Sequence, residues 1–329
     1  MGGNAIKSSQ RISLEEFQTY CAELKIIFPE LKMAIVKSYR QKKDFGDIDI
    51  IVQKIPMFDI KQLVKDRLNP SEIYDNNMFF SFLYKKAQVD FILTPEDEFQ
   101  NTDDYFGNGD LFNFLGRTAR SLNFKLAHNG FYYEEHLDDH YKITTLVSKD
   151  TQKILEFLGY DYNLWKAGFD TIEEILTYGA SSTLFNSLYF TLEDQSHNDR
   201  VRNKKRKMYQ NMLQYIIDNN IEPKPKLTPE ERQKFYDKAV QVFGAKFDNE
   251  VKEARAKYEI HKQFKALFNG DIVNHITGFE GKSLGKCMKA IHDKYPNLKE
   301  IVLLGGSDIV YDIVESMKDK ILDVVKELP

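Results

Sequence analysis

Residues 37–52 read Lys37-Ser-Tyr-Arg-Gln-Lys-Lys-Asp-Phe-Gly-Asp-Ile-Asp-Ile-Ile-Val52 and place two aspartates inside an apolar run. Strands are depleted in aspartate, so two of them at alternate positions of a strand are unusual. Side chains two residues apart in a strand point to the same face of the sheet. We therefore predict that Asp47 and Asp49 project together, while Ile48 and Ile50 enter a core.

A third aspartate has similar surroundings further along the chain. The run Gln88-Val-Asp-Phe-Ile-Leu93 is typical of a strand and places Asp90 between apolar neighbours. If the two strands are neighbours, Asp90 completes a site of three carboxylates. Like charges held side by side repel each other unless a cation lies between them, and Mg²⁺ and Mn²⁺ prefer oxygen ligands. The sequence therefore predicts a catalytic site in which Asp47, Asp49 and Asp90 hold two such ions.

The turn from Ser38 to Gly46 precedes the paired aspartates. It is short and polar, and it carries the cations Arg40, Lys42 and Lys43. Backbone N–H groups and cations together can hold phosphate groups. The turn is therefore a predicted triphosphate-binding segment.

The composition excludes several classes of protein. The chain has 329 residues, 42% of them hydrophobic, which favours two domains over one. No apolar stretch is long enough to span a membrane, and the start of the sequence lacks the apolar core of a secretory signal. Cys21 and Cys287 are the only cysteines, which excludes a disulfide scaffold. We therefore expect an intracellular, cytoplasmic protein.

The net charge is −4, from 46 basic and 50 acidic side chains. Any nucleic-acid binding must therefore use a local basic patch. The most basic stretch is His197–Gln210, in which Tyr209 is available to stack on a base. The residues predicted to track phosphates are Arg200, Arg202, Lys204, Lys205 and Arg206.

The order of the predicted elements indicates an α+β fold. Ser13 and Glu16 form a capping box at the start of a helix over 13–29. Strands are predicted at 33–36, 48–52, 79–84 and 88–93, with a short pair at 125–133. A loop is predicted over 101–110 and a helix over 111–122. Later helices are predicted at 149–159, 172–178, 184–192, 203–219, 229–268, 285–294 and 309–328, with a connector over 219–229.

The aspartates and the preceding turn resemble the nucleotidyltransferase motif of the DNA polymerase beta superfamily, specifically that of family X polymerases. The resemblance implies that Asp47 and Asp49 bind both metal ions. It implies that Asp90 lies beside the primer 3′-hydroxyl, and that Ser38 and Gly46 contact the triphosphate.

A second motif is similar to the thumb signature of the same family. It reads Tyr105-Phe-Gly-Asn-Gly-Asp-Leu-Phe-Asn113, with Arg117 four positions on. The resemblance implies that Tyr105 and Phe106 border the sugar of the incoming nucleotide. Asp110 and Asn113 would contact its base, and Arg117 would touch the template strand.

The resemblance covers about residues 11–165 and implies three domains. These are a nucleotidyltransferase palm over 1–100, a thumb over 101–165, and a helical domain over 166–329 that binds nucleic acid. The implied activity is template-directed addition of dNMP to a primer 3′-hydroxyl, with a nucleoside triphosphate and primer-template DNA as partners. The family's N-terminal lyase region has no counterpart here, so no lyase activity is expected.

Three positions depart from the family pattern. Lys37 stands where a glycine usually precedes the motif serine, and Gln41 replaces the second arginine of a pair. Gln88 replaces a basic residue two positions before the third carboxylate, so we expect the orientation of Asp90 to differ.

Two alternative functions remain open. Residues 261–294 resemble the tail of tRNA CCA-adding enzymes, which would make the chain an RNA 3′-end nucleotidyltransferase. A non-catalytic nucleic-acid-binding protein on a decayed transferase fold is the other alternative. The presence of all three aspartates speaks against decay.

Overall fold

The computed structural model describes residues 5–191 and 197–326, without the side chains of Arg202 and residues 319–326. The chain divides into two compact units, Met1–Asp248 and Asn249–Pro329. The division falls within helix α11 (Ala245–Leu267). Both predicted domain boundaries, after residues 100 and 165, lie inside the first unit.

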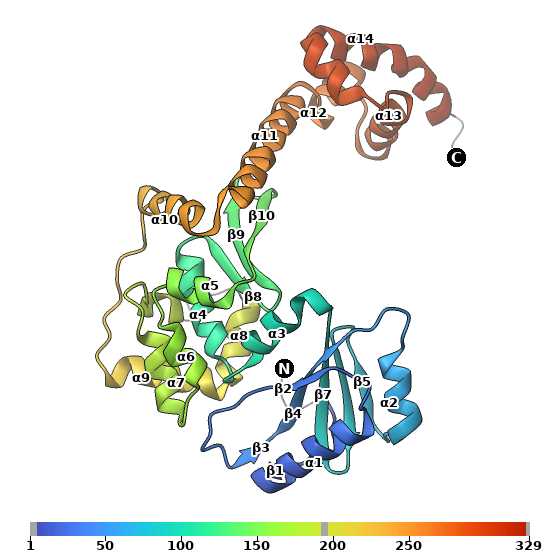
Figure 1. Ribbon diagram of the computed structural model, residues 1–329. Helices are drawn as coiled ribbons and strands as arrows, with labels where there is room; N and C mark the ends of the chain where they lie inside the picture. The colour runs from blue at the N-terminus through green and yellow to red at the C-terminus, as the bar shows by residue number, and fades with distance from the viewer. Residues whose placement is uncertain (1–4, 192–196, 327–329) are drawn as a thin grey trace. The chain divides into compact units, whose positions relative to one another are not determined.

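A five-stranded mixed sheet forms the first part of unit 1 (Figure 1), which agrees with the predicted α+β class. Strands β4 and β7 are parallel, and the other neighbouring pairs are antiparallel. In spatial order the strands are β2 (Met33–Ile35), β4 (Asp47–Gln53), β7 (Ala87–Thr94), β6 (Phe79–Tyr84) and β5 (Ile73–Asp75). A separate short pair joins β1 (Ile12–Ser13) to β3 (Asp44–Phe45).

Helices α1 (Leu14–Ile27) and α2 (Ile60–Leu68) contribute to the core of this sheet. The predicted capping box of Ser13 and Glu16 is present at the start of α1. Ile48 and Ile50 of β4 are buried with Leu24 of α1 in one hydrophobic cluster. Burial of each such side chain stabilises the fold by about 1.5–3 kcal/mol. Because side chains alternate along a strand, this packing leaves Asp47 and Asp49 on the opposite face.

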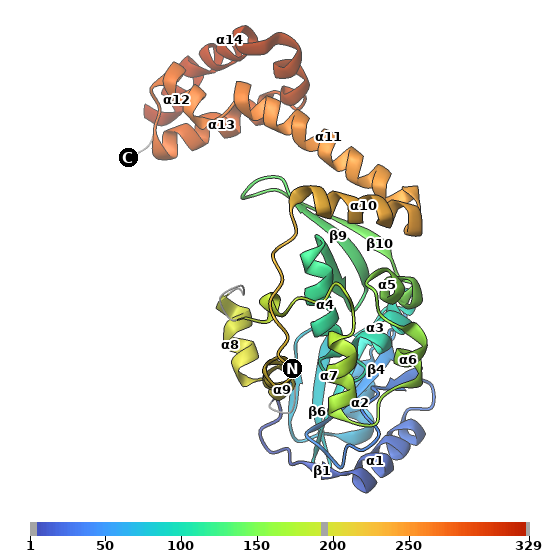
Figure 2. The ribbon, with the colours of Figure 1, turned by 90° about the vertical axis from the view of Figure 1, so that its left-hand side faces the viewer.

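A three-stranded antiparallel sheet follows, in the order β10-β9-β8 (Figure 2). Its strands are β8 (Phe124–Ala127), β9 (Gly130–His136) and β10 (Lys142–Ser148). The predicted pair at 125–133 is confirmed by β8 and β9, whereas β10 was not predicted. Helix α4 (Leu111–Ser121) agrees with the prediction and packs on β8.

The predicted loop over 101–110 is wrong for its first half, because helix α3 extends over Phe99–Phe106. Asn and Asp favour loops when their side chains compete for nearby backbone groups. Here tertiary contacts engage these side chains instead. Asn101 donates a hydrogen bond to the carbonyl of Lys149 at 2.6 Å, and Asp104 accepts one from Thr151.

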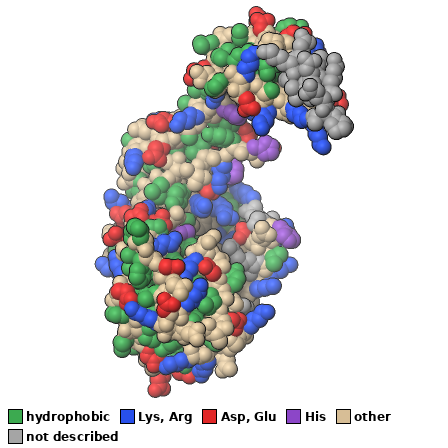
Figure 3. Space-filling view, turned by 90° about the vertical axis from the view of Figure 1, so that its right-hand side faces the viewer, with side chains coloured by type: hydrophobic (Ala, Val, Ile, Leu, Met, Phe, Trp, Pro, Cys, Tyr) green, Lys and Arg blue, Asp and Glu red, His purple; other side chains and the backbone are tan. Residues whose placement is uncertain are grey.

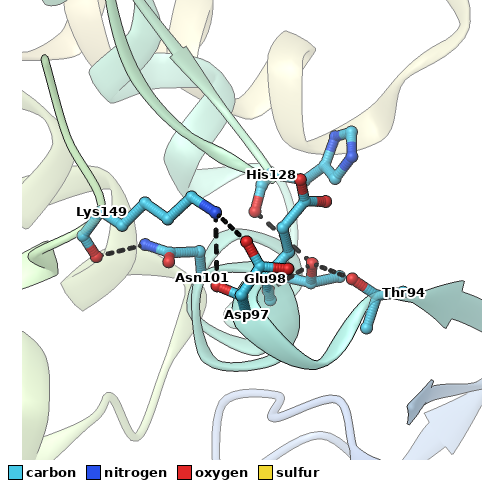
Figure 4. A network of polar contacts seen from close by, with 7 residues as sticks. Thr94, Asp97, Glu98, Asn101, His128 and Lys149 are labelled. Carbon is cyan, nitrogen blue, oxygen red and sulfur yellow. Dashed lines mark hydrogen bonds and ion pairs between the residues drawn. The ribbon is translucent and has the colours of Figure 1, made fainter. Parts of the chain in front are cut away.

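A polar network holds α3 between the two sheets (Figure 4). The hydroxyls of Thr94, in β7, and Thr102, in α3, are 3.0 Å apart. The ammonium of Lys149, just after β10, lies 2.7 Å from the carboxylate of Asp97. These bonds connect β7, α3 and the end of β10 in one cluster.

The helices that follow residue 150 continue the fold of unit 1. Phe114 of α4 shares a buried cluster with Leu176, Phe190 and Met212. This core crosses residue 165, so the later helices pack directly on the thumb-like segment. The elements after residue 150 are α5 (Thr151–Phe157), α6 (Tyr162–Ala167), α7 (Ile172–Ala180), η2 (Ser187–Phe190), α8 (His197–Lys205), α9 (Lys207–Asp218) and α10 (Pro229–Phe243). The short η1 (Glu96–Glu98) precedes α3.

Three predicted helices differ from the structure. The one over 203–219 is divided at Arg206, whose extended backbone separates α8 from α9. The segment 184–192 contains only the short η2, where the side chain of Asn186 accepts from the amide of Leu188, and residue 192 lies outside the described residues. The predicted helix over 229–268 is divided at Gly244, whose φ of +92° ends α10. The predicted start at Thr228 is confirmed by a capping box with Glu231.

Unit 2 contains α12 (Gly270–Thr277), α13 (Gly281–Lys294) and α14 (Leu298–Lys326). Their buried cluster includes Val273, Cys287 and Val302, so the unit has its own core. Gly306 breaks α14 with a φ of +65°. Across both units, the described residues include no helix long and apolar enough to cross a membrane.

We expect Gly130→Ala to destabilise unit 1. Gly130 has φ +144°, and an added Cβ would lie 2.7 Å from Leu146 Cδ1 and 3.1 Å from the carbonyl of Ser148. Strain and overlap together should lower the free energy of unfolding by about 1–3 kcal/mol, measured by urea denaturation. Gly116→Ala is the control, because Gly116 lies in helix α4 and an added Cβ meets nothing closer than 3.9 Å. Equal stability of Gly130→Ala and the wild type would contradict the proposed strain.

Candidate metal centre and adjoining cavities

Strands β4 and β7 bring the three predicted aspartates together. The parallel register places Asp49 directly beside Asp90, and Asp47 beside Gln88. One carboxylate oxygen from each aspartate lies within 4.8 Å of the others. As predicted, the strands are neighbours and the aspartates share a face, while Ile48 and Ile50 are 0% and 1% exposed on the other.

Burial and the neighbouring negative charges make Asp49 and Asp90 difficult to ionise. Burial raises the pKa of Asp49 well above its ordinary value, and the charges of Asp47 and Asp90 add to the effect. Burial also raises the pKa of Asp90, although hydrogen bonds from Ser81 and Gln88 oppose the increase. A divalent cation would relieve the repulsion, and carboxylate oxygens are the ligands that Mg²⁺ and Mn²⁺ prefer. The three residues therefore fit such an ion by donor chemistry and spacing.

Lys42 is the cation of the polar turn that lies near the carboxylates. Its ammonium donates to Ser38 Oγ at 3.4 Å and lies 4.4 Å from the ring centre of Phe45. Burial lowers the pKa of Lys42, while the charges of Asp47 and Asp49 act to raise it. The predicted triphosphate-binding segment is thus close to the metal centre at its Ser38 and Lys42 positions.

Arg40 points away from the carboxylates. Its guanidinium forms an ion pair with Asp170 and donates to the carbonyl of Ala167 at 2.9 Å. Its backbone amide donates to the carbonyl of Phe169, also at 2.9 Å. The structure therefore anchors the turn to residues 167–170, which is an interaction that sequence analysis did not predict.

Gly46 lies between β3 and β4, immediately before Asp47. An added Cβ would come within 3.2 Å of Nη1 of Arg11. The same guanidinium forms an ion pair with Asp44 at 2.6 Å. A side chain at Gly46 would therefore press on this pair.

Ser38 and Arg40 also border a cavity of about 660 Å³. Lys37, Lys149 and Lys166 line the same cavity and give it a basic character. The indole Nε1 of Trp165, another lining residue, is buried without a hydrogen-bond partner among the described residues.

A second cavity, of about 490 Å³, collects the residues of the thumb-like motif. Five of its lining residues were predicted from that motif, namely Tyr105, Phe106, Asp110, Asn113 and Arg117. Two further cations, Arg120 and Lys125, line the cavity and were missed. Arg120 follows Arg117 by three helical positions, which is the spacing that places two side chains on one face.

Two arginines of this cavity are engaged by other side chains and carbonyls. Arg206 forms an ion pair with Asp110 at 2.8 Å, and the two side chains are 15% and 25% exposed. Arg117 donates to the carbonyl of Tyr189 at 2.6 Å and stacks on the ring of Tyr209 at 4.8 Å. Arg206 thus lies with the residues of the thumb-like motif rather than with the exposed basic patch in which it was grouped.

The remaining patch residues lie on α8. Arg200, Lys204 and Lys205 are exposed and line neither cavity, and the side chain of Arg202 lies outside the described residues. On the face drawn in Figure 3, Lys and Arg side chains are interspersed with acidic side chains. Arg200, Lys204 and Lys205 thus provide exposed positive charge on one helix, where a local basic patch was predicted for any nucleic-acid binding.

Comparison with known proteins places the chain in no family: no protein-family model matches it, and neither does any curated protein sequence.

We expect Asp49→Asn to stabilise the protein at neutral pH when divalent cations are removed with EDTA. The pKa of Asp49 is raised in the folded state, so the unfolded chain ionises this group more readily. The free energy of unfolding therefore falls as pH rises from the ordinary aspartate range, near about 4, towards the raised pKa. The advantage of Asp49→Asn should appear in urea denaturation at neutral pH and shrink on acidification.

Added Mn²⁺ should reverse the order, because a ligand bound only by the folded state stabilises the wild type. Asp44→Asn is the control, since hydrogen bonding from Arg11 lowers the pKa of Asp44. If Asp49→Asn were less stable than the wild type in EDTA at neutral pH, the electrostatic account of the cluster would be wrong.

Proposed function

We propose that this chain is a metal-dependent nucleotidyltransferase with a polymerase beta-like palm and thumb, acting as a template-directed DNA polymerase of the family X type. The observation that carries the proposal is the convergence of Asp47, Asp49 and Asp90 on one face of β4 and β7. The cavity lined by the thumb-like motif, from Tyr105 to Arg117, supports it.

The proposed reaction forms a bond between the primer 3′-oxygen and the α-phosphorus of a dNTP. The bond to the β-phosphate breaks, and pyrophosphate leaves. Asp47 and Asp49 would hold both metal ions, and Asp90 would hold the one beside the primer. Two Mg²⁺ ions bound there would acidify the primer hydroxyl and neutralise the triphosphate.

The chain's own residues contribute mainly alignment and charge. Ser38 and Lys42 lie near the carboxylates, where a triphosphate would need donors and a cation. One of the metal-binding carboxylates would accept the hydroxyl proton. Holding the reactants in this geometry replaces a bimolecular encounter by a reaction within one complex.

The second cavity would receive the sugar and base. Tyr105 and Phe106 provide apolar surface, and Asp110 and Asn113 provide hydrogen-bonding groups. Arg120 and Lys125 add positive charge at the same cavity, which suits a template strand. Exposed cations of α8 would contact more distant phosphates.

The decisive assay is primer extension on a DNA duplex with a one-nucleotide gap, using Mg²⁺ and each dNTP in turn. We expect incorporation of the complementary nucleotide alone. Asp90→Asn should reduce the rate at least about a thousandfold, because several kcal/mol of transition-state stabilisation are lost. A far-UV circular dichroism spectrum matching that of the wild type would show that the fold of this variant remains intact.

Other outcomes distinguish the alternatives. Untemplated addition of ribonucleotides to RNA 3′ ends would support the RNA transferase. Nucleic-acid binding with neither transfer activity nor metal-dependent nucleotide binding would support the non-catalytic protein. Substantial activity of Asp90→Asn would contradict the three-carboxylate mechanism.

We expect the Arg206–Asp110 ion pair to orient Asp110 towards the bound base. Arg206→Ala should raise KM for the dNTP about 5- to 30-fold with little change in kcat, because a charge-assisted hydrogen bond is worth about 1–2 kcal/mol. Steady-state kinetics of Arg206→Ala, Asp110→Asn and the double variant would test this in a double-mutant cycle. Additive effects would show that the two residues act independently.

A further inference from the structure

The segment from Ala5 to Gln10, which we call the N-terminal strap, is fastened to the five-stranded sheet at several points. The carboxylate of Glu72 accepts hydrogen bonds from the amides of Lys7, at 2.6 Å, and Ser8, at 3.2 Å. It also accepts the Ser8 hydroxyl at 2.6 Å. The amide of Gln10 donates to the carbonyl of Lys86 at 2.8 Å. These bonds hold the strap at its middle and at its C-terminal end.

Gln88 connects this strap to the metal centre. Its Oε1 accepts from the backbone amides of Ala5, at 3.1 Å, and Ile6, at 3.0 Å. Its Nε2 donates to both carboxylate oxygens of Asp90, at 2.9 and 3.0 Å. Gln88, Ile6 and Asp90 are only 1%, 1% and 5% exposed, so water cannot readily replace these bonds.

The four bonds determine the orientation of the Gln88 amide. A flipped amide would place its NH₂ group against two N–H donors and its oxygen against a carboxylate. Each unpaired buried group would cost about 1–3 kcal/mol. The strap amides therefore specify which end of Gln88 faces Asp90.

The neutral side-chain amide of Gln88 affects the charge near Asp90 differently from a basic residue at the same position. A cation beside Asp90 would stabilise the ionised carboxylate but would repel a metal ion. The neutral amide of Gln88 directs the carboxylate by hydrogen bonds alone. Ser81, opposite Asp90 on β6, provides another hydrogen bond to it.

We propose that Gln88 is a positioning residue and that the N-terminal strap is part of the metal centre. The strap orients Gln88, and Gln88 holds the Asp90 carboxylate where it can bind a metal ion with Asp47 and Asp49. This inference rests on the metal site of the proposed function and goes beyond it, because it assigns a role to a segment 83 residues away from Gln88.

The test is Mn²⁺ affinity, measured on the full chain by isothermal titration calorimetry without nucleotide. Gln88→Met preserves approximate length but removes both sets of hydrogen bonds, and it should weaken Mn²⁺ binding about 10- to 100-fold. Glu72→Ala loosens the strap without touching Gln88 or the aspartates, and it should weaken binding in the same direction by a smaller factor.

Gly130→Ala is the stability-matched control, because it should destabilise unit 1 without altering the metal centre. If Gln88→Met loses stability but keeps wild-type affinity, as this control should, Gln88 is merely structural and the proposal fails. If Gln88→Met does not fold, wild-type affinity of Glu72→Ala would overturn the role of the strap. Absence of Mn²⁺ binding by the wild type would also overturn it.

The two proposals can fail separately. Mn²⁺ binding that depends on Gln88, without nucleotide transfer to any primer, would contradict the proposed function and support the positioning role. If the wild type shows metal-dependent transfer and Gln88→Met and Glu72→Ala keep its Mn²⁺ affinity, the proposed function would be supported. The positioning role of Gln88 and the strap would then be contradicted.

Discussion

Electrostatic repulsion among Asp47, Asp49 and Asp90 is the constraint on which the rest of unit 1 depends. Two adjacent strands carry three acidic side chains on one face, and burial raises the pKa of two of them, Asp49 and Asp90. The opposite face compensates, because β4 and β7 bury apolar side chains there against α1 and α2. Stability on one face of the sheet thus allows an unfavourable arrangement of charge on the other, as is common at functional sites.

The surrounding structure meets the same constraint by orienting dipoles and cations towards the cluster. Gln88 and Ser81 donate to Asp90, and Lys42 lies where the charges of Asp47 and Asp49 act on it. The helices after residue 165 share a core with α4. This packing brings Arg206 to Asp110, at the start of α4. Site and scaffold are therefore built by segments that are far apart in sequence.

Much of the local structure could be predicted from residue patterns. Apolar runs predicted β4, β6 and β7, and the alternation of side chains along a strand correctly placed Asp47 and Asp49 on one face. Patterns failed where long-range contacts decide the outcome. The Asn and Asp residues of α3 indicated a loop, since their partners Lys149 and Thr151 lie almost fifty positions away. The departure at Gln88 was visible in the sequence, but its bonds to Ala5 and Ile6 were not.

The strap also has a consequence for the order of events during synthesis. Ala5 and Ile6 leave the ribosome 83 and 82 residues before the side chain that they bind. Closing so long a loop carries an entropic cost that the final hydrogen bonds must offset. The carboxylate cluster can therefore reach its final geometry only after β7 has been translated and paired with β4. Until then the two acidic side chains of β4 lack the alignment with Asp90 that a metal ion requires.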